Sequence, residues 1–323
     1  MLWFFEIDGS RSQIEFATVV CARSPRGLEP FATRAQPQEA REPTGIHSVG
    51  EMRFKDPMLS THKDVFTEMF FRDAGHGYDE FGFHPKTARW GIKALAPLYN
   101  TYFRVKGHET DRIPKEGPAV LAANHAGMLP VDAIMLSLDV FANTAPARWP
   151  RASMDHFVPL MPFVGTFFSR CGAVAGSRGN FGRLLDAGEL VTAFPEGVPG
   201  IQKPIWKRYQ LQEWRVGHCE LAIRHSAPVV PVGIIGSEEQ WPQVGRIDSI
   251  KPFGAPYLPI PITPVPLPVR IHIHYGEPIP LHEDYAPEES DDPSVLATAA
   301  ARVKDAVQGL IAKGLEEREG LFR

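Results

Sequence analysis

Short apolar runs and segments with helical spacing alternate along most of the 323 residues. The runs at 119–123, 189–194 and 229–235 are nearly uninterrupted, as in strands that are buried on both faces of a parallel sheet. Helical spacing follows two of them, at 131–142 and 217–225. This alternation predicts a single α/β domain with a largely parallel central sheet flanked by helices.

Three further segments complete the predicted architecture. Residues 166–174 are predicted to be strand-like. In 269–275, Val, Ile, Ile and Tyr alternate with Arg and two His, which predicts a half-exposed strand. Residues 294–319 carry an Ala, Val and Leu face and are predicted to form a terminal helix.

The N-terminal part of the chain has a different pattern. Residues 1–51 mix Arg, Pro, Gly and Ser without steady periodicity, which indicates a poorly ordered extension. The domain predicted at 52–323 begins with amphipathic helices at 62–72 and 87–103. An apolar face on the second helix either packs on the sheet or lies in a membrane interface. This face is formed by Trp90, Ala94, Leu95, Leu98 and Tyr102.

Contact with lipid is therefore expected only from the membrane surface. No run approaches the roughly 18 apolar residues of a spanning helix. At the N-terminus, Glu6 and Asp8 interrupt what would be the apolar core of a signal peptide. Peripheral contact is predicted through 87–103, through the apolar, proline-rich stretch at 257–267, or through both.

Composition limits the possible partners, cellular compartment and metal sites of the protein. A net charge of −4 gives no argument for a nucleic-acid partner. The cysteines Cys21, Cys171 and Cys219 form neither a metal-binding spacing nor a disulfide framework, which favours a reducing, cytoplasmic setting. His76 and His84 lack a second pair of ligands at strand or helix spacing, so this region is predicted to be a loop. No metal and no cofactor is expected.

Candidate chemistry lies at the end of the run at 119–123. His125 is placed where a predicted strand hands over to a helix, after a turn that contains Gly127 and Pro130. Asp132 in the first helical turn could bond one ring nitrogen of His125, leaving the other nitrogen to act as a general base. The alternative is a turn residue at Asn124, a loop histidine and a carboxylate that only complements the helix N-terminus.

Two other loops also follow predicted strands. Arg178 lies in a loop rich in small residues, and Glu196-Gly197 follows the run at 189–194. Because the carboxyl ends of parallel strands meet at one edge of a sheet, these groups are predicted to converge with His125. A guanidinium suits a phosphate or carboxylate, and a carboxylate could accept hydrogen bonds from substrate hydroxyls.

As an ordered set, these motifs resemble the four-block pattern of the lysophospholipid and glycerol-3-phosphate acyltransferase family, whose members include 1-acylglycerol-3-phosphate acyltransferases. The resemblance covers roughly residues 95–278. Its blocks are Asn124-His125 with Asp132, the Gly-x-Val segment with Arg178, Phe194-Pro-Glu-Gly197 and Val230-Pro-Val232.

This resemblance implies transfer of a fatty acyl group from acyl-CoA or acyl-carrier protein to a hydroxyl of a lysophospholipid or glycerol phosphate, at the cytoplasmic face of a membrane. His125 would be the base and Asp132 the acid that orients it. Arg178 would bind the acceptor's phosphate, with Arg170 and Arg183 as rivals. The acceptor site would be lined by Asn124, Glu196 and Gly197.

One departure affects the assignment. Six residues separate His125 from Asp132 here, where the family usually has four. The longer spacing resembles a bacterial subgroup of the family. Two alternatives stay open: a thioesterase or lipid hydrolase that uses the same pair to activate water, and a peripheral lipid-binding protein without catalysis.

Overall fold

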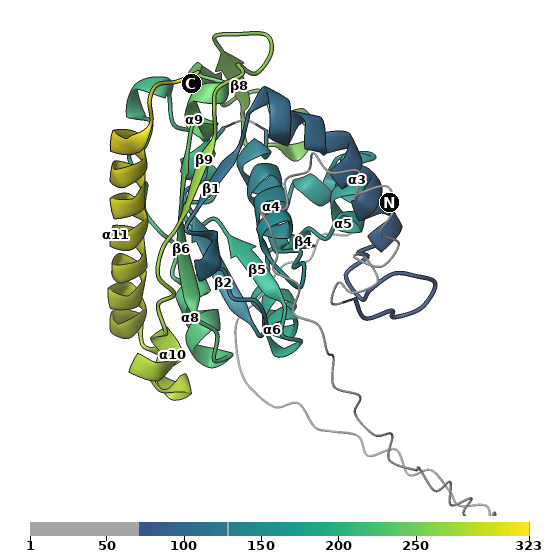
Figure 1. The fold of residues 1–323 in the computed structure, drawn as a ribbon, viewed down its shortest axis with the longest axis vertical. Helices are drawn as coiled ribbons and strands as arrows, with labels where there is room; N and C mark the ends of the chain where they lie inside the picture. The colour runs from purple at the N-terminus through teal and green to yellow at the C-terminus, as the bar shows by residue number, and fades with distance from the viewer. Residues whose placement is uncertain (1–70, 128, 323) are drawn as a thin grey trace, which may run out of the picture. The chain divides into compact units, whose positions relative to one another are not determined.

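The computed structural model describes residues 71–127 and 129–322, and its core is a seven-stranded sheet (Figure 1). The strand order is β1-β9-β6-β2-β5-β3-β4. All neighbouring strands are parallel except β6 and β9, which are antiparallel, so the predicted fold class is confirmed. The strands are β1 (Lys106–His108), β2 (Ala119–Ala123), β3 (Arg151–Met154), β4 (Val174–Ala175), β5 (Leu190–Ala193), β6 (Val229–Ile235) and β9 (His272–Tyr275).

Alternate residues of the central strand β2 build two separate cores. Ala119 and Leu121 belong to a cluster with residues of α3 and α4, whereas Val120 and Ala122 pack with residues of α6, α8 and α11. Because both faces of the sheet are covered, β2 reads as a continuous apolar run. The helices are α3 (Pro85–Pro97), α4 (Val131–Asn143), α5 (Val164–Arg170), α6 (Arg178–Asp186), α7 (Val198–Ile201), α8 (Gly217–Arg224), α9 (Ser237–Gln240), α10 (Leu281–Asp284) and α11 (Pro293–Glu317).

The proline-rich stretch forms part of a small, separate hairpin. Strands β7 (Gln243–Ile247) and β8 (Leu258–Pro261) pair antiparallel with a register irregularity near Gln243. Figure 1 shows β8 at the end of the molecule where α9 also lies. In the part of the chain that the structure describes, no helix is both long enough and apolar enough to cross a membrane.

Two predictions about individual elements were wrong. Residues 166–174 do not form one strand, because α5 occupies Val164–Arg170 and only the two residues of β4 pair with β3. The helix α5 packs against α3, and this tertiary contact outweighs the strand preference of Phe167 and Phe168.

Helix α3 packs on the core with a different face from the one predicted at 87–103. Helix α3 buries Ala88, Ile92 and Ala96, while Trp90 is 64% exposed and Leu98, just beyond the helix, is 38% exposed. Ala88 and Ile92 pack in the same core cluster as residues of β2. Trp90 and Leu98 face outward, and the membrane-interface alternative stays a prediction.

The strand predicted to be half-exposed at 269–275 is buried on both faces. His272 is 8% exposed and His274 is 0% exposed, because α11 covers the face that carries them. The extension predicted for 1–51, and all but the last two residues of the helix predicted at 62–72, lie outside the described residues.

Candidate active site

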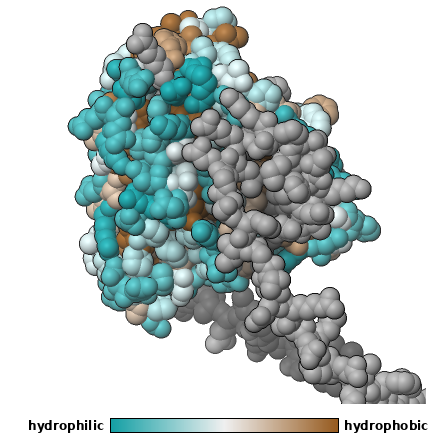
Figure 2. All heavy atoms as spheres, in the orientation of Figure 1, coloured by the Kyte–Doolittle hydropathy of each residue, from teal (hydrophilic) through white to brown (hydrophobic). Residues whose placement is uncertain are grey.

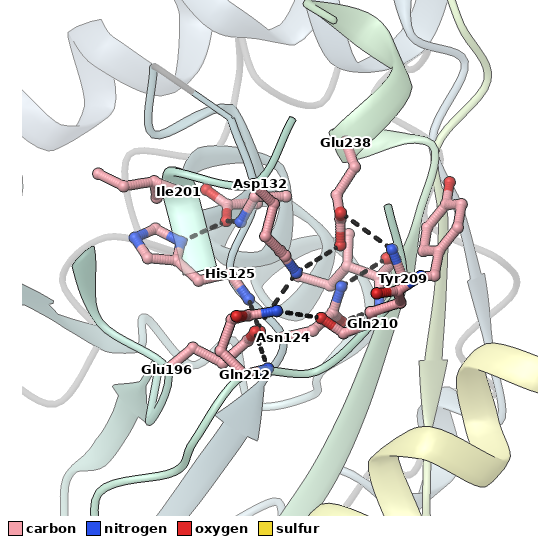
Figure 3. A network of polar contacts seen from close by, with 12 residues as sticks. Asn124, His125, Asp132, Glu196, Ile201, Tyr209, Gln210, Gln212 and Glu238 are labelled. Carbon is pink, nitrogen blue, oxygen red and sulfur yellow. Dashed lines mark hydrogen bonds and ion pairs between the residues drawn. The ribbon is translucent and has the colours of Figure 1, made fainter. Parts of the chain in front are cut away.

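His125 and Asp132 are in direct contact at the carboxyl end of β2 (Figure 3). Asp132 Oδ2 lies 2.6 Å from His125 Nδ1 and also accepts a hydrogen bond of 2.8 Å from the backbone N–H of Ala126. Its other oxygen, Oδ1, accepts from the N–H of Ala133 at 2.8 Å, so the fully buried carboxylate is held by several donors. Gly127, with φ 84°, makes the turn that brings the acid back.

The contact with Asp132 sets the ionisation of His125. Burial alone would lower the pKa of the imidazole, but the charge and hydrogen bond of Asp132, with smaller contributions from Asp155 and Glu196, leave that pKa raised above its ordinary value. Since Nδ1 is held by the acid, Nε2 is the nitrogen available to exchange a proton with a substrate. The ring also stacks on Phe194, with centroids 4.4 Å apart.

The loop after β5 holds the backbone of His125 through Glu196. Glu196 is 1% exposed, and its Oε1 accepts the backbone N–H of His125 at 3.0 Å. Its Oε2 accepts the N–H of Gln212 at 2.8 Å and pairs with Lys203 Nζ at 3.3 Å. Lys203 Nζ also donates to Glu238 Oε1 at 2.9 Å, so one buried ammonium bridges two carboxylates. Both oxygens of Glu196 are therefore engaged within the protein.

Asn124 and Gly197 are likewise part of the framework. The side-chain amide of Asn124 donates to the carbonyl of Ile234 at 3.0 Å and accepts its N–H at 2.7 Å, which ties the end of β2 to β6. Gly197 has φ 55° and is buried, with the Arg215 guanidinium directly beside it. These residues lie next to His125, but their observed contacts are with the protein's own backbone and side chains.

A cavity of about 510 Å³ opens beside the histidine. Its walls are mostly apolar and come from α3, α4, the 149–173 region and residues 252–259. Ile92, Leu138, Met154 and Phe168 are among the lining residues, together with His125 itself. Cys171 also lines it, and burial raises the pKa of this thiol to about 11, which disfavours a thiolate nucleophile. An alkyl chain is the ligand that such walls suit.

The structure does not bring Arg178 to this site. His125 and Glu196 follow β2 and β5, which are neighbours, whereas Arg178 follows β4 at the edge of the sheet. It begins α6, is 75% exposed and pairs with Glu220 at 2.8 Å. Its rival Arg183 pairs with Glu80 and is 56% exposed. Headgroup binding by Arg178 stays a prediction.

Two basic residues near the histidine were missed in the sequence. Lys203 and Arg215 flank a segment that has no strand or helix period, so no pattern assigned their side chains to the site. A lysine seven residues after Glu196 was the available sign for Lys203. The Arg215 guanidinium is exposed and lies about 3 Å from where a Cβ on Gly197 would stand, with Cζ at 3.1 Å.

The segment that holds this site is similar to a known enzyme family. The family model described as "Acyltransferase" matches residues 104–235, which include both members of the dyad and Glu196. The chain belongs to this family and is an enzyme of the acyltransferase type.

Similar proteins occur in mycobacteria. An uncharacterized protein of Mycobacterium tuberculosis is 35% identical over 258 residues, which are 76% of this chain and 72% of that protein. An uncharacterized protein of Mycobacterium leprae is 32% identical over 333 residues, covering 98% of this chain and 90% of that protein. Among solved structures, the 1-acyl-sn-glycerophosphate (LPA) acyltransferase PlsC from Thermotoga maritima is similar with a TM-score of 0.48 and 17% identity, over 73% of this chain and 80% of that chain.

Proposed function

We propose that this enzyme transfers a fatty acyl group from acyl-CoA or acyl-carrier protein to a hydroxyl of a lysophospholipid or glycerol phosphate. One observation carries the proposal: His125 lines an apolar cavity, and its Nδ1 lies 2.6 Å from Oδ2 of the buried Asp132. The candidate base is therefore next to a space that suits an alkyl chain. This is what attack by a hydroxyl on a long-chain thioester requires.

The proposed reaction needs only one proton carrier. His125 Nε2 accepts the proton of the acceptor hydroxyl as its oxygen attacks the thioester carbon. Asp132 stabilises the imidazolium that forms, since its charge already raises the pKa of the ring. Collapse of the tetrahedral intermediate breaks the C–S bond, and the imidazolium returns the proton to the departing thiolate. An ester and a free thiol result, and His125 is neutral again.

The acceptor's phosphate needs a cation near the histidine. Arg178 is the sequence-predicted candidate, but its guanidinium is already paired with Glu220. Arg215 is a second candidate, because its exposed guanidinium lies against Gly197 while Glu196 of the same loop contacts His125. A planar guanidinium binds a phosphate bidentately, which favours arginine for this role.

We also propose that the enzyme works while lying on the cytoplasmic surface of a membrane. The segments that wall the cavity expose other apolar side chains to solvent: Trp90 is 64% exposed, Leu160 is 72% exposed and Phe163 is 90% exposed. Phe163 also has φ 63°, an uncommon conformation for an aromatic residue. Ile262 and Val265, after β8, are 56% and 60% exposed. Figure 2 shows apolar residues gathered at the end of the molecule where Figure 1 places β8.

The deciding experiment measures where the acyl group of the thioester goes, to the acceptor lipid or to free fatty acid. Purified protein is incubated with labelled acyl-CoA or acyl-carrier protein and a panel of lysophospholipids and glycerol phosphate, in the presence of vesicles, and the lipids are read by mass spectrometry. Acyl transfer that depends on the acceptor supports the proposal. Release of free fatty acid at the same rate without acceptor would indicate the thioesterase, and unaltered lipid would indicate a binding protein.

A further inference from the structure

Three histidines meet at the opposite edge of the sheet from β4. His108 ends β1, and His272 and His274 lie two residues apart on β9. The parallel register pairs His108 with His274, so all three side chains share the face that α11 covers. One ligand nitrogen from each ring lies within 4.8 Å of those of the other two. Among the described residues, this is the one such cluster of potential metal ligands.

The cluster has hydrogen-bonding groups that the protein does not satisfy. His274 is 0% exposed, and neither of its ring nitrogens has a hydrogen-bond partner among the described residues. The same holds for His272 Nε2 and for Oε2 of the neighbouring Glu109. A neutral imidazole carries an N–H and a lone pair, and leaving both unpaired in the interior is unfavourable. A metal ion would use the lone pairs of two of these groups, His274 Nδ1 and Glu109 Oε2.

We propose that His108, His272 and His274 bind a divalent transition-metal ion, Zn²⁺ in the first instance, with Glu109 as the fourth ligand. Ligands on a tetrahedral zinc lie about 3.3 Å apart, given bonds of about 2.0 Å. His108 Nε2 is 3.0 Å from His272 Nδ1, and His274 Nδ1 is 3.7 Å from Glu109 Oε2. These two separations bracket the required value.

Binding requires a small rearrangement. The rings of His108 and His274 are stacked at 4.1 Å and only 5° from parallel, so their lone pairs do not converge. One ring must turn about χ2, and the hydrogen bond between His108 and His272 must give way to two bonds to the ion. Glu109 has φ 55°, and strain of this kind at a residue with a side chain is often found where a side chain is held for function.

The charged groups around the cluster include two carboxylates, although cationic side chains outnumber them. Glu109 and Glu317 supply two carboxylates, against Lys106, Arg270 and Lys313. Lys313 occupies the other oxygen of Glu109 at 2.5 Å and leaves Oε2 free to bind.

The proposed ion would join the edge strand β1 to its neighbour β9, beneath the terminal helix. Strand β1 has only three residues, and β9 packs against α11 (Figure 1). Gly314 of α11 lies directly over His274, since a Cβ there would stand 2.8 Å from Nε2. The site is therefore structural, and it is independent of the His125 dyad and of the proposed acyl transfer.

Tag-free full-length protein, stripped with a chelator, is titrated with Zn²⁺ at pH 7.5 and compared with His108→Gln and with His84→Gln. His84 is a half-buried histidine outside the cluster that is hydrogen-bonded to Thr87. Wild type and His84→Gln should bind one Zn²⁺ and gain thermal stability. His108→Gln should bind at least about tenfold more weakly and gain correspondingly less thermal stability at the same Zn²⁺ concentration.

A second measurement uses the wild-type protein, so its result does not depend on whether a variant folds. Co²⁺ bound to wild type should give the intense visible absorption of a tetrahedral site, and Zn²⁺ should displace it. Glu109→Gln should weaken Zn²⁺ binding about 10–100-fold, and unchanged affinity would remove Glu109 as a ligand. Absence of stoichiometric binding by wild type, or equal binding by His108→Gln, would overturn the site.

Discussion

The sharpest test of the proposed mechanism is to separate His125 from Asp132. General-base catalysis typically supplies a factor of about 10²–10⁴, so His125→Ala should lower kcat by about that much. The buried, charged hydrogen bond at 2.6 Å is worth roughly 1.5–3 kcal/mol, which corresponds to a loss of about 10- to 150-fold in Asp132→Asn. An amide NH₂ would also face N–H donors that the carboxylate now accepts, so the upper part of this range is expected.

The pH profile tests the same pair without relying on the size of the rate loss. As a base, His125 must be neutral, so kcat/KM should rise with pH through a pKa above the ordinary value for histidine. In Asp132→Asn both effects of the acid are lost while burial remains. The pKa should then fall below its ordinary value, and the acid limb of the profile should move to lower pH.

Initial rates are measured from pH 5 to 9 by release of CoA thiol, on proteins whose folding is checked by circular dichroism. Asp155→Asn is the matched control, because Asp155 lines the same cavity and acts on His125 only through its charge. It should change kcat by a few-fold at most. The double variant at 125 and 132 should lose little more than His125→Ala alone. An acid limb that stays in place in a folded Asp132→Asn protein would refute the dyad.

Three further predictions concern other parts of the molecule. Arg215→Ala should raise the acceptor KM at least about tenfold in steady-state kinetics, with little change in the donor KM. Arg178→Ala should have a smaller effect because Arg178 is exposed and paired with Glu220, and the reverse ranking would favour Arg178 as the phosphate-binding residue. Replacing Trp90 and Phe163 by Ser should reduce binding to anionic vesicles in flotation assays while leaving the melting temperature unchanged, and undiminished flotation would contradict the surface claimed here. Burial raises the pKa of Asp139 to about 6, above the 3.8 of the unfolded state, so its contribution to stability should fall by up to about 3 kcal/mol as pH rises from 4 to 7. In Asp139→Asn, the free energy of unfolding measured with urea should depend less on pH, and an unchanged pH dependence would count against this.

The dyad could be predicted because its determinants are local. A strand of five buried residues, a glycine at φ 84° and a proline at the start of the next helix fix the path from His125 to Asp132. Two extra residues relative to the usual family spacing lengthen the turn without moving the acid out of reach. Convergence of Glu196 also followed from chain pattern, since β5 pairs directly with β2.

The place of Arg178 could not be predicted, because the order of strands in the sheet is not the order in the chain. Strand β5 is inserted between β2 and β3, which moves β4 and its loop to the edge. Arg215 was missed for a different reason. It sits beside Gly197 because its own N–H donates to the carbonyl of Pro195 at 3.0 Å, a contact between two irregular segments that leaves no periodic trace.

The buried histidines of β9 show how a correct face assignment still led to a wrong environment. Alternation in 269–275 separates Ile271, Ile273 and Tyr275 from His272 and His274, and the structure keeps this division. His272 and His274 were predicted to face solvent because nothing in the strand's own sequence shows that another element packs over its polar face. That cover is α11, about twenty residues later, and it approaches closely because position 314 is glycine. A helix with a larger residue there would have to move away from His274, so Gly314 is what lets α11 bury the histidine face of β9.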